Sequence, residues 1–263
     1  MPDMFSTNWR WKGILAFNLL AAFILATWLW QPTRQLWDAV DTSVFHWLNA
    51  SLASNTTWAK IWAISNMRPF DIGVGILMIG LLIKRDWVFN GTQIRRALLA
   101  LLALFVLLLL VRFGFDAILK AIQWKRTSPS LLVSDAVRLT QLFPDWQAHL
   151  YLKDSSEQCF PGDHASVLLV WALLASGFAR GWKLLLVWLI TILFMLPRLV
   201  AGAHWLSDDL VGGVFLSFVA FGWGFYSPYA ARTSALMEKL TAPIFKLLNK
   251  IPLLNKLSLI SGA

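Results

Sequence analysis

The stretch ALLALLALFVLLLLVRFGFDAI, residues 97–118, decides the fold of this chain. It is very rich in leucine, and its length is close to the roughly 20 residues that an α-helix needs to cross the hydrocarbon core of a membrane. Apolar blocks recur on both sides of it, at about residues 13–30, 71–83 (or from as early as 61), 164–179, 184–199 and 204–225. The pattern predicts an all-α, polytopic membrane bundle of about six transmembrane helices in a single domain, residues 1–263.

The composition argues against an ordinary soluble domain. Hydrophobic residues make up 58% of the chain and charged residues 14%, with a mean hydropathy of +0.61, whereas a soluble domain carries roughly 25% charged residues. The net charge is +9, but the cations stand in short clusters rather than in one basic stripe. We therefore expect membrane lipids and no nucleic acid as partners. The single cysteine, Cys159, forms no internal disulfide and is interpreted as a small packing residue.

The basic clusters predict how the chain crosses the membrane. They fall at residues 10–12, 84–96 and 180–183 and in a tail at about 228–263. About six crossings from a cytoplasmic N-terminus place all of them on the cytoplasmic side, where Lys and Arg are in excess. Both termini are then cytoplasmic, and the polar stretch 120–163 faces outward together with the turn before residue 204. Residues 31–66 are expected to form an outer loop, and residues 235–257 an amphipathic helix on the inner surface.

A first polar motif, KRTSP at residues 125–129, follows the leucine-rich stretch. Its adjacent cations, Lys125 and Arg126, precede two hydroxyl groups, one of them on Ser128, and a rigid proline. Such a set suits an anion with several oxygens, which an Arg binds through two parallel hydrogen bonds. The same segment is also typical of a solvated cluster at the membrane interface, and both interpretations stay open on the residues alone.

A second motif, FPGDH at residues 160–164, opens the next apolar block. Gly162 permits the backbone to approach a ligand closely, and the unpaired N–H groups at the start of a helix attract an anion. His164 lies in the first turn, where it can hand a proton to a leaving oxygen. A lone histidine at the end of a span is also commonly an interfacial residue.

A third motif, RLVAGAHWLSD at residues 198–208, joins the last two apolar blocks. His204 and Asp208 are four residues apart and share one helical face, so the carboxylate can fix the tautomer of the imidazole while its other nitrogen attacks. The small residues 201–203 turn the chain back toward Arg198. A purely structural ion pair is the alternative. His46 and His149 have no such neighbours and are expected in loops.

Together the motifs offer cations for phosphate oxygens, one histidine to attack and another to protonate a leaving group. This is a set of groups for phosphoryl transfer. The sequence contains no cluster of carboxylates or cysteines suited to a metal, so we expect a mechanism without metal or cofactor.

The spacing Arg-x5-His-x3-Asp, here Arg198, His204 and Asp208, resembles the third motif of the type-2 phosphatidic acid phosphatase superfamily, and the order of the three motifs matches over nearly the whole chain. The resemblance implies a six-helix membrane fold in which His204 forms a phosphohistidine, Asp208 orients it and His164 is the acid. It also implies that Arg126 and Arg198 bind the phosphate, whereas neither Lys120 nor Lys125 has the usual spacing of the first-motif lysine. With the residues of the motifs, the predicted set at the substrate phosphate is Lys125, Arg126, Ser128, Gly162, Asp163 and Arg198.

Two motifs depart from the usual superfamily pattern. The second usually reads Pro-Ser-Gly-His, and the first usually has a Lys seven residues before its Arg and a Pro directly after it. These departures resemble the branch of the lipid A 1-diphosphate synthases, with motifs at residues 125–129, 160–164 and 197–205. That branch implies undecaprenyl diphosphate as the donor, lipid A as the acceptor, and a site on the periplasmic face of the inner membrane. A lipid phosphatase and a non-catalytic lipid-binding or transport protein are the alternatives.

Overall fold

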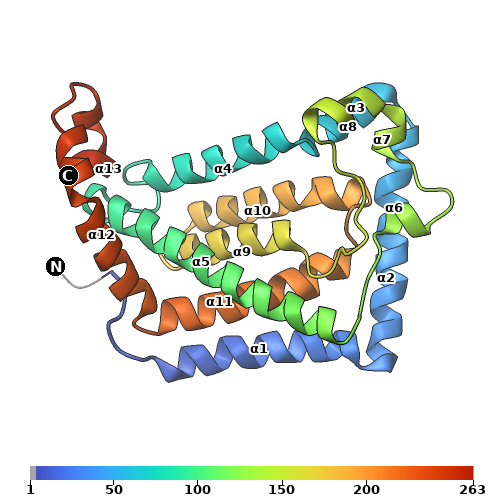
Figure 1. The fold of residues 1–263 in the computed structure, drawn as a ribbon, viewed down its shortest axis with the longest axis horizontal. Helices are drawn as coiled ribbons and strands as arrows, with labels where there is room; N and C mark the ends of the chain where they lie inside the picture. Colours follow the sequence, from blue (N-terminus) through green and yellow to red (C-terminus); the bar gives the residue numbers. More distant parts are fainter. Residues whose placement is uncertain (1–3, 263) are drawn as a thin grey trace.

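The computed structural model describes residues 4–262, and every regular element in that part of the chain is a helix (Figure 1). The longer apolar helices run roughly side by side. They are α1 (Trp11–Leu29), α4 (Arg68–Ile83), α5 (Gly91–Ala121), α9 (Asp163–Ser176), α10 (Trp182–Val200) and α11 (Val214–Tyr226), the last preceded by a π-helical turn, η2 (Asp208–Gly213). The prediction of an all-α fold is confirmed.

Length and composition identify the helices that can cross a membrane. Among residues 4–262, four candidates qualify: α1, α5, α10 and the continuous segment Asp208–Tyr226. The pair α3 (Thr56–Ser65) and α4 adds a fifth, bent by 63° at the break between its two helices. Helix α9 is apolar but has only 14 residues. Each predicted block thus contains an apolar helix, while length and composition alone support four or five spans rather than six.

Residues 31–66 are mostly helical, so the prediction of a loop there is wrong, while their outer location stays a prediction. They form α2 (Gln31–Ala50), a 3-10 turn η1 (Ser51–Ala53) and α3. Asp41, Phe45 and Asn49 recur every fourth residue of α2 and are all buried, so a segment of polar composition has one face that packs on the protein. Helix α2 lies across one end of the bundle (Figure 1).

Short helices occupy the polar stretch between α5 and α9. They are α6 (Pro129–Leu132), α7 (Leu139–Leu142) and α8 (Pro144–Leu150), and an irregular segment, residues 151–162, follows them. His46 and His149, which we expected in loops, lie in α2 and α8. The stretch is therefore a compact cap of helical turns rather than an open loop.

The tail contains α12 (Tyr229–Leu248), a 3-10 turn η3 (Leu254–Lys256) and α13 (Ser258–Ser261). Helix α12 contacts α5 and keeps an exposed apolar row of Leu236, Leu240, Ile244 and Leu247. This is the spacing of an amphipathic helix, which begins earlier and ends earlier than the range 235–257 predicted for it. Its place on the inner membrane surface stays a prediction.

The centre of the bundle is packed where α5, α9 and α11 meet. Leu104, Trp171 and Leu216 contribute one fully buried side chain from each helix. The approach of α11 to α5 depends on Gly224, where a Cβ atom would lie 2.2 Å from the Cδ2 atom of Leu104. In a lipid surrounding, such close packing replaces the hydrophobic effect as the force between helices.

Candidate active site

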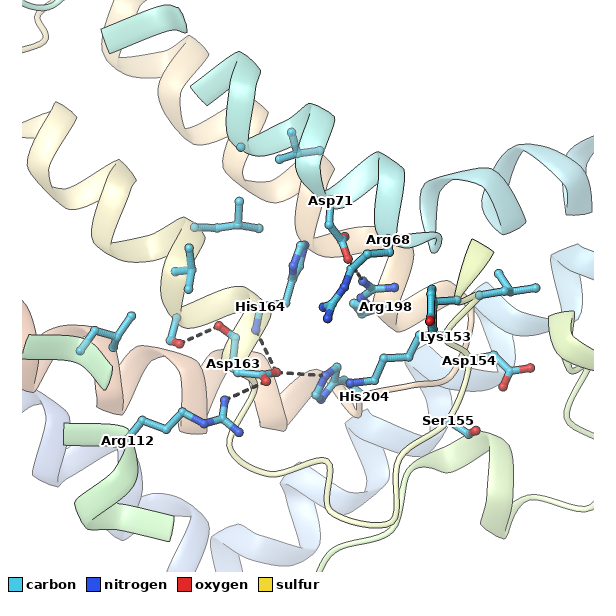
Figure 2. Close-up of a pocket in the computed structure, with 18 of the residues that line it drawn as sticks. Arg68, Asp71, Arg112, Lys153, Asp154, Ser155, Asp163, His164, Arg198 and His204 are labelled. Carbon is cyan, nitrogen blue, oxygen red and sulfur yellow. Dashed lines mark hydrogen bonds and ion pairs between the residues drawn. The ribbon is translucent and has the colours of Figure 1, made fainter. Parts of the chain in front are cut away.

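A cavity of about 1060 Å³ lies among α4, α5, α9, α10 and the segment before α9. His164, Arg198 and His204 line it together, so the second and third motifs meet in one place (Figure 2). The other charged residues of its wall are Arg68, Asp71, Arg112, Asp116, Lys153, Asp154 and Asp163. The apolar part of the wall includes Val74, Met78, Leu108, Phe113 and Val167. A wall of this kind suits a ligand with a charged head and an apolar chain.

His204 is a buried residue in the short connection between α10 and η2. Its Nδ1 atom lies 2.8 Å from the carbonyl oxygen of Cys159. Because a carbonyl can only accept a hydrogen bond, Nδ1 carries the ring proton and Nε2 keeps the lone pair. The Oδ2 atom of Asp208 is 3.6 Å from Nδ1. The carboxylate expected to orient the ring is thus adjacent, and the Cys159 carbonyl supplies the hydrogen bond.

Gly202 makes the turn that carries His204. Its φ of +74° lies in the left-handed region, and a Cβ atom there would lie 2.7 Å from the ring of Phe45. The carbonyl of Arg198 accepts the N–H groups of Ala203 and His204, at 2.9 and 3.3 Å. The small residues therefore do turn the chain back, as the sequence predicts, and Arg198 and His204 reach the same cavity.

Gly162 holds the start of α9 against η2. Its N–H group donates to the carbonyl of Asp208 at 2.8 Å, and a Cβ atom would lie 2.3 Å from the Oδ1 atom of Asp209. The close backbone approach that glycine permits is therefore used between two motifs of the protein itself. The N–H of Gly162, expected at a substrate phosphate, is already committed to Asp208.

His164 lies in the first turn of α9 and also has a defined tautomer. Its Nε2 atom is 2.9 Å from the carbonyl oxygen of Phe194 in α10, so Nε2 carries a proton. The other nitrogen, Nδ1, is then the atom at which a second proton can be gained or released.

Arg198 is a buried cation near the end of α10, on the wall of the cavity. Its Nη2 atom lies 2.6 Å from the Oδ2 atom of Asp71, and its Nη1 atom donates to the backbone and side-chain oxygens of Asn66 at 3.0 and 2.8 Å. These contacts hold the guanidinium of Arg198 at the cavity wall. A residue expected to bind the substrate phosphate needs such a position.

Arg126 is also buried, but it does not line this cavity. Its Nη1 atom lies 2.5 Å from the Oδ1 atom of Asp208 and 2.8 Å from the Oγ atom of Ser207, and its Nη2 atom lies 2.7 Å from the Oδ2 atom of Asp41. Asp41 also accepts both the N–H and the O–H of Ser207. The guanidinium, expected at the substrate phosphate, is thus enclosed between two carboxylates and supports Asp208.

Lys125 and Ser128 are likewise absent from the cavity wall. Lys125 is exposed and lines a separate cavity of about 400 Å³. Ser128 is buried and exchanges two hydrogen bonds with Ser156, while the carbonyl of Arg126 accepts the N–H of Cys159 at 2.8 Å. The first motif therefore ties down the segment whose Cys159 carbonyl holds His204.

Comparison with known proteins agrees with this arrangement. Residues 96–232, more than half of the chain, match the PAP2 superfamily. The chain belongs to this superfamily. Lipid A 1-diphosphate synthase of Escherichia coli (strain K12) is 26% identical over 228 residues, which cover 86% of this chain and 92% of that enzyme. No solved structure matches the chain. The resemblance predicted from the motifs is confirmed, and it indicates a membrane enzyme that acts on lipid phosphates.

Asp163 stands between His204 and Arg112 in the PAP2 site. Its Oδ1 atom is 3.9 Å from the Nε2 atom of His204, and its Oδ2 atom is 2.9 Å from the Nη1 atom of Arg112 (Figure 2). Arg112 also approaches Asp116, at 3.4 Å. A carboxylate therefore lies beside the ring nitrogen of His204 that keeps its lone pair. The sequence predicts Asp163 at the site but not its link to Arg112.

The motifs do not predict six charged residues around the site: Asp41, Arg68, Asp71, Arg112, Asp116 and Lys153. Arg112 and Asp116 stand four residues apart inside the leucine-rich stretch, and ionisable residues are costly enough there to indicate a functional site. Asp41, Arg68 and Asp71 precede the part of the chain that matches the PAP2 superfamily. Among residues 4–262, no group of three or more His, Cys, Asp or Glu is placed to hold a metal ion.

Proposed function

We propose that this chain transfers the terminal phosphoryl group of undecaprenyl diphosphate to the 1-phosphate of lipid A, through a phosphohistidine at His204. The products are lipid A 1-diphosphate and undecaprenyl phosphate. PAP2 membership supports the lipid phosphate chemistry. The choice of donor and acceptor rests on the likeness to lipid A 1-diphosphate synthase of E. coli and on the motifs shared with that branch.

The tautomer of His204 is the observation that carries the proposal. The hydrogen bond from Nδ1 to the Cys159 carbonyl leaves the lone pair on Nε2, and His204 lines a cavity with His164 and Arg198. A nitrogen with a free lone pair, an acid and a cation around one space are the groups that a phosphoryl transfer needs.

The reaction has two halves. In the first, Nε2 of His204 attacks the terminal phosphorus of the donor, the bond from phosphorus to the bridging oxygen breaks, and undecaprenyl phosphate leaves with the electron pair. His164 gives a proton to that leaving oxygen. In the second half, an oxygen of the acceptor phosphate attacks the same phosphorus. The N–P bond breaks, its electron pair returns to Nε2, and His164 takes up a proton from solvent, which restores the enzyme for the next donor.

The supporting residues take different parts in this reaction. Arg198 binds oxygens of the phosphoryl group, since its guanidinium is held at the cavity wall. Asp208 stabilises the charged ring of His204, and Arg126 positions Asp208. No metal or cofactor takes part. We place the reaction at the periplasmic face of the inner membrane, because the basic clusters away from the site then fall on the cytoplasmic side.

The test uses the purified full chain in detergent, with undecaprenyl diphosphate labelled in its terminal phosphate, and with or without lipid A. We expect label on lipid A, an acid-labile phosphoenzyme in the absence of acceptor, and loss of both in His204→Ala. His149→Ala is the matched control, because His149 is exposed on α8 and does not line the cavity. Label that appears only as free phosphate would make the protein a phosphatase. Full activity in His204→Ala would overturn the phosphohistidine.

A further inference from the structure

Two cations of the cavity, Arg68 and Lys153, form no ion pair with a carboxylate in the described chain. The other two are paired: Arg198 with Asp71 at 2.6 Å and Arg112 with Asp163 at 2.9 Å. Figure 2 shows Arg68, Lys153 and Arg198 together on the side of His204 away from Arg112. Two of the three cations on this side of the cavity therefore have no carboxylate paired with them among the described residues.

Asn66 fixes this cationic side in place. Its backbone oxygen accepts the N–H group of Lys153 at 3.1 Å and the Nη1 of Arg198 at 3.0 Å. Arg68 follows two residues later, at the start of α4. Asn66 itself is fully buried, and its amide donates to the carbonyl of Pro197 at 2.8 Å. Asn66 thus holds the backbone of Lys153 and the guanidinium of Arg198 next to the start of α4, where Arg68 lies.

The three cations also influence one another. The pKa of Lys153 lies below its usual value, first because burial withdraws the ammonium from water, and then because Arg198, Arg112 and Arg68 repel it, while Asp71 acts in the opposite sense. Arg68 and Lys153 are both exposed to the cavity opening, so their charges are accessible to a ligand, and a bound anion with several charges would relieve their mutual repulsion.

We propose that Arg68 and Lys153 form a second phosphate subsite, which holds the phosphate of a phosphorylated glycolipid acceptor beside phosphorylated His204. The neighbouring wall supplies uncharged hydrogen-bonding groups from Gln147, Tyr151 and Ser155, which suit the hydroxyl groups of a sugar. The subsite rests on the proposed function, because an acceptor subsite is useful only if His204 is phosphorylated and its phosphoryl group is transferred to an acceptor.

The second half of the reaction explains why such a subsite is needed. An anionic oxygen of the acceptor phosphate attacks the phosphorus, a P–O bond forms, the N–P bond breaks, and the electron pair goes to Nε2 of His204. No proton has to be removed, but two phosphate groups of like charge have to come together. Cations next to the acceptor phosphate reduce that repulsion. Water as acceptor carries no charge and gains nothing comparable from them.

The experiment measures how the phosphoenzyme divides its label between lipid A and water in Lys153→Met and Arg68→Met. Met keeps much of the length of either side chain and removes its charge. We expect the acceptor KM to rise about 10- to 100-fold, which corresponds to the loss of one charge-assisted hydrogen bond, so that the ratio of transferred to released phosphate falls. The matched control is Lys60→Met, an exposed lysine of α3 that does not line the cavity. Retained thermal stability and phosphoenzyme formation exclude misfolding.

Three outcomes would overturn the subsite. An unchanged acceptor KM in both variants would leave the two cations without this role. Equal losses of phosphoenzyme formation and transfer would assign them to the donor instead. Inorganic phosphate could also accept the label, giving inorganic diphosphate. If it did so with the same efficiency as lipid A, the subsite would not be specific for a glycolipid. Failure of the proposed function looks different, because the wild-type chain would then form no phosphoenzyme dependent on His204.

Discussion

Asp163 places a negative charge beside the nitrogen that we assign as the nucleophile. Two like unit charges about 4 Å apart repel by about 4 kcal/mol at an effective dielectric constant near 20. The side chain of Asp163 is 47% exposed and paired with Arg112, so the net effect on a bound phosphate is nearer 1 kcal/mol. We therefore expect Asp163→Asn, which removes the charge and keeps the shape, to lower the inhibition constant of inorganic phosphate about fivefold.

Asp116→Asn is the control for this prediction. Asp116 approaches the same arginine, at 3.4 Å, but has no ion pair with His204. Its substitution should change phosphate inhibition much less than the change at Asp163. If both variants respond equally, Asp163 acts through Arg112 rather than through its own charge beside His204.

At the scale of elements, the contact of α9 with η2 sets the relative position of the second and third motifs. Gly162→Ala would place a Cβ atom 2.3 Å from the Oδ1 atom of Asp209 and 2.8 Å from the carbonyl oxygen of Asp208. Because both neighbours belong to a packed helical turn, one of the elements has to move, and we expect a loss of about 1–3 kcal/mol of stability. Thermal unfolding in detergent should show a lower midpoint together with reduced transfer.

Gly73→Ala provides the comparison within the same protein. Gly73 is exposed in α4, and a Cβ atom there would meet nothing within 4 Å. Since alanine favours a helix over glycine by about 1 kcal/mol, this variant should keep or raise the midpoint. If Gly162→Ala unfolds at the same midpoint as the wild type, the contact between α9 and η2 accommodates the added methyl group without loss of stability.

Helices with a long apolar sequence could be predicted from the sequence. Helices held in place by contacts with residues far away in the chain could not. The block at 184–199 became α10, Trp182–Val200, because apolar length alone identifies such a helix. Helix α2 lacks that signal. Its buried Asn49 bonds to the carbonyls of Val137 and Val200, and its Asp41 bonds to Arg126, 85 residues away in the chain. No local pattern contains those partners.

The same reason limits what the motifs say about the site. His164, Arg198 and His204 could be placed together, because their motifs fall at the ends of neighbouring apolar blocks. Arg126 also belongs to a motif, but its guanidinium binds Asp41 and does not line the cavity. Asp41 lies in α2, the segment for which the sequence predicts a loop. Lys153 belongs to no motif, and its backbone is bound to Asn66, 87 residues earlier in the chain, at the cavity wall.

On the scale of the whole molecule, the two ends of the bundle differ in what they carry. Figure 1 shows both termini, α12 and α13 at one end, and α2, α3, α6, α7 and α8 at the other. The basic tail lies at the first end, and the turns that frame the cavity lie at the second. Because Lys and Arg concentrate on the cytoplasmic side of a membrane, the second end, with the candidate site, should face the periplasm.

Single cysteines test this orientation directly. The natural Cys159 is fully buried, so the unsubstituted chain should give little background with a membrane-impermeant maleimide. Lys60→Cys on α3 and Lys239→Cys on α12 introduce a thiol at an exposed position at either end. In spheroplasts with an intact inner membrane, we expect the first to be labelled fully and the second only after permeabilisation. The reverse pattern would show that the protein has the opposite orientation. The His204 cavity would then lie on the cytoplasmic side, and transfer at the periplasmic face would be ruled out.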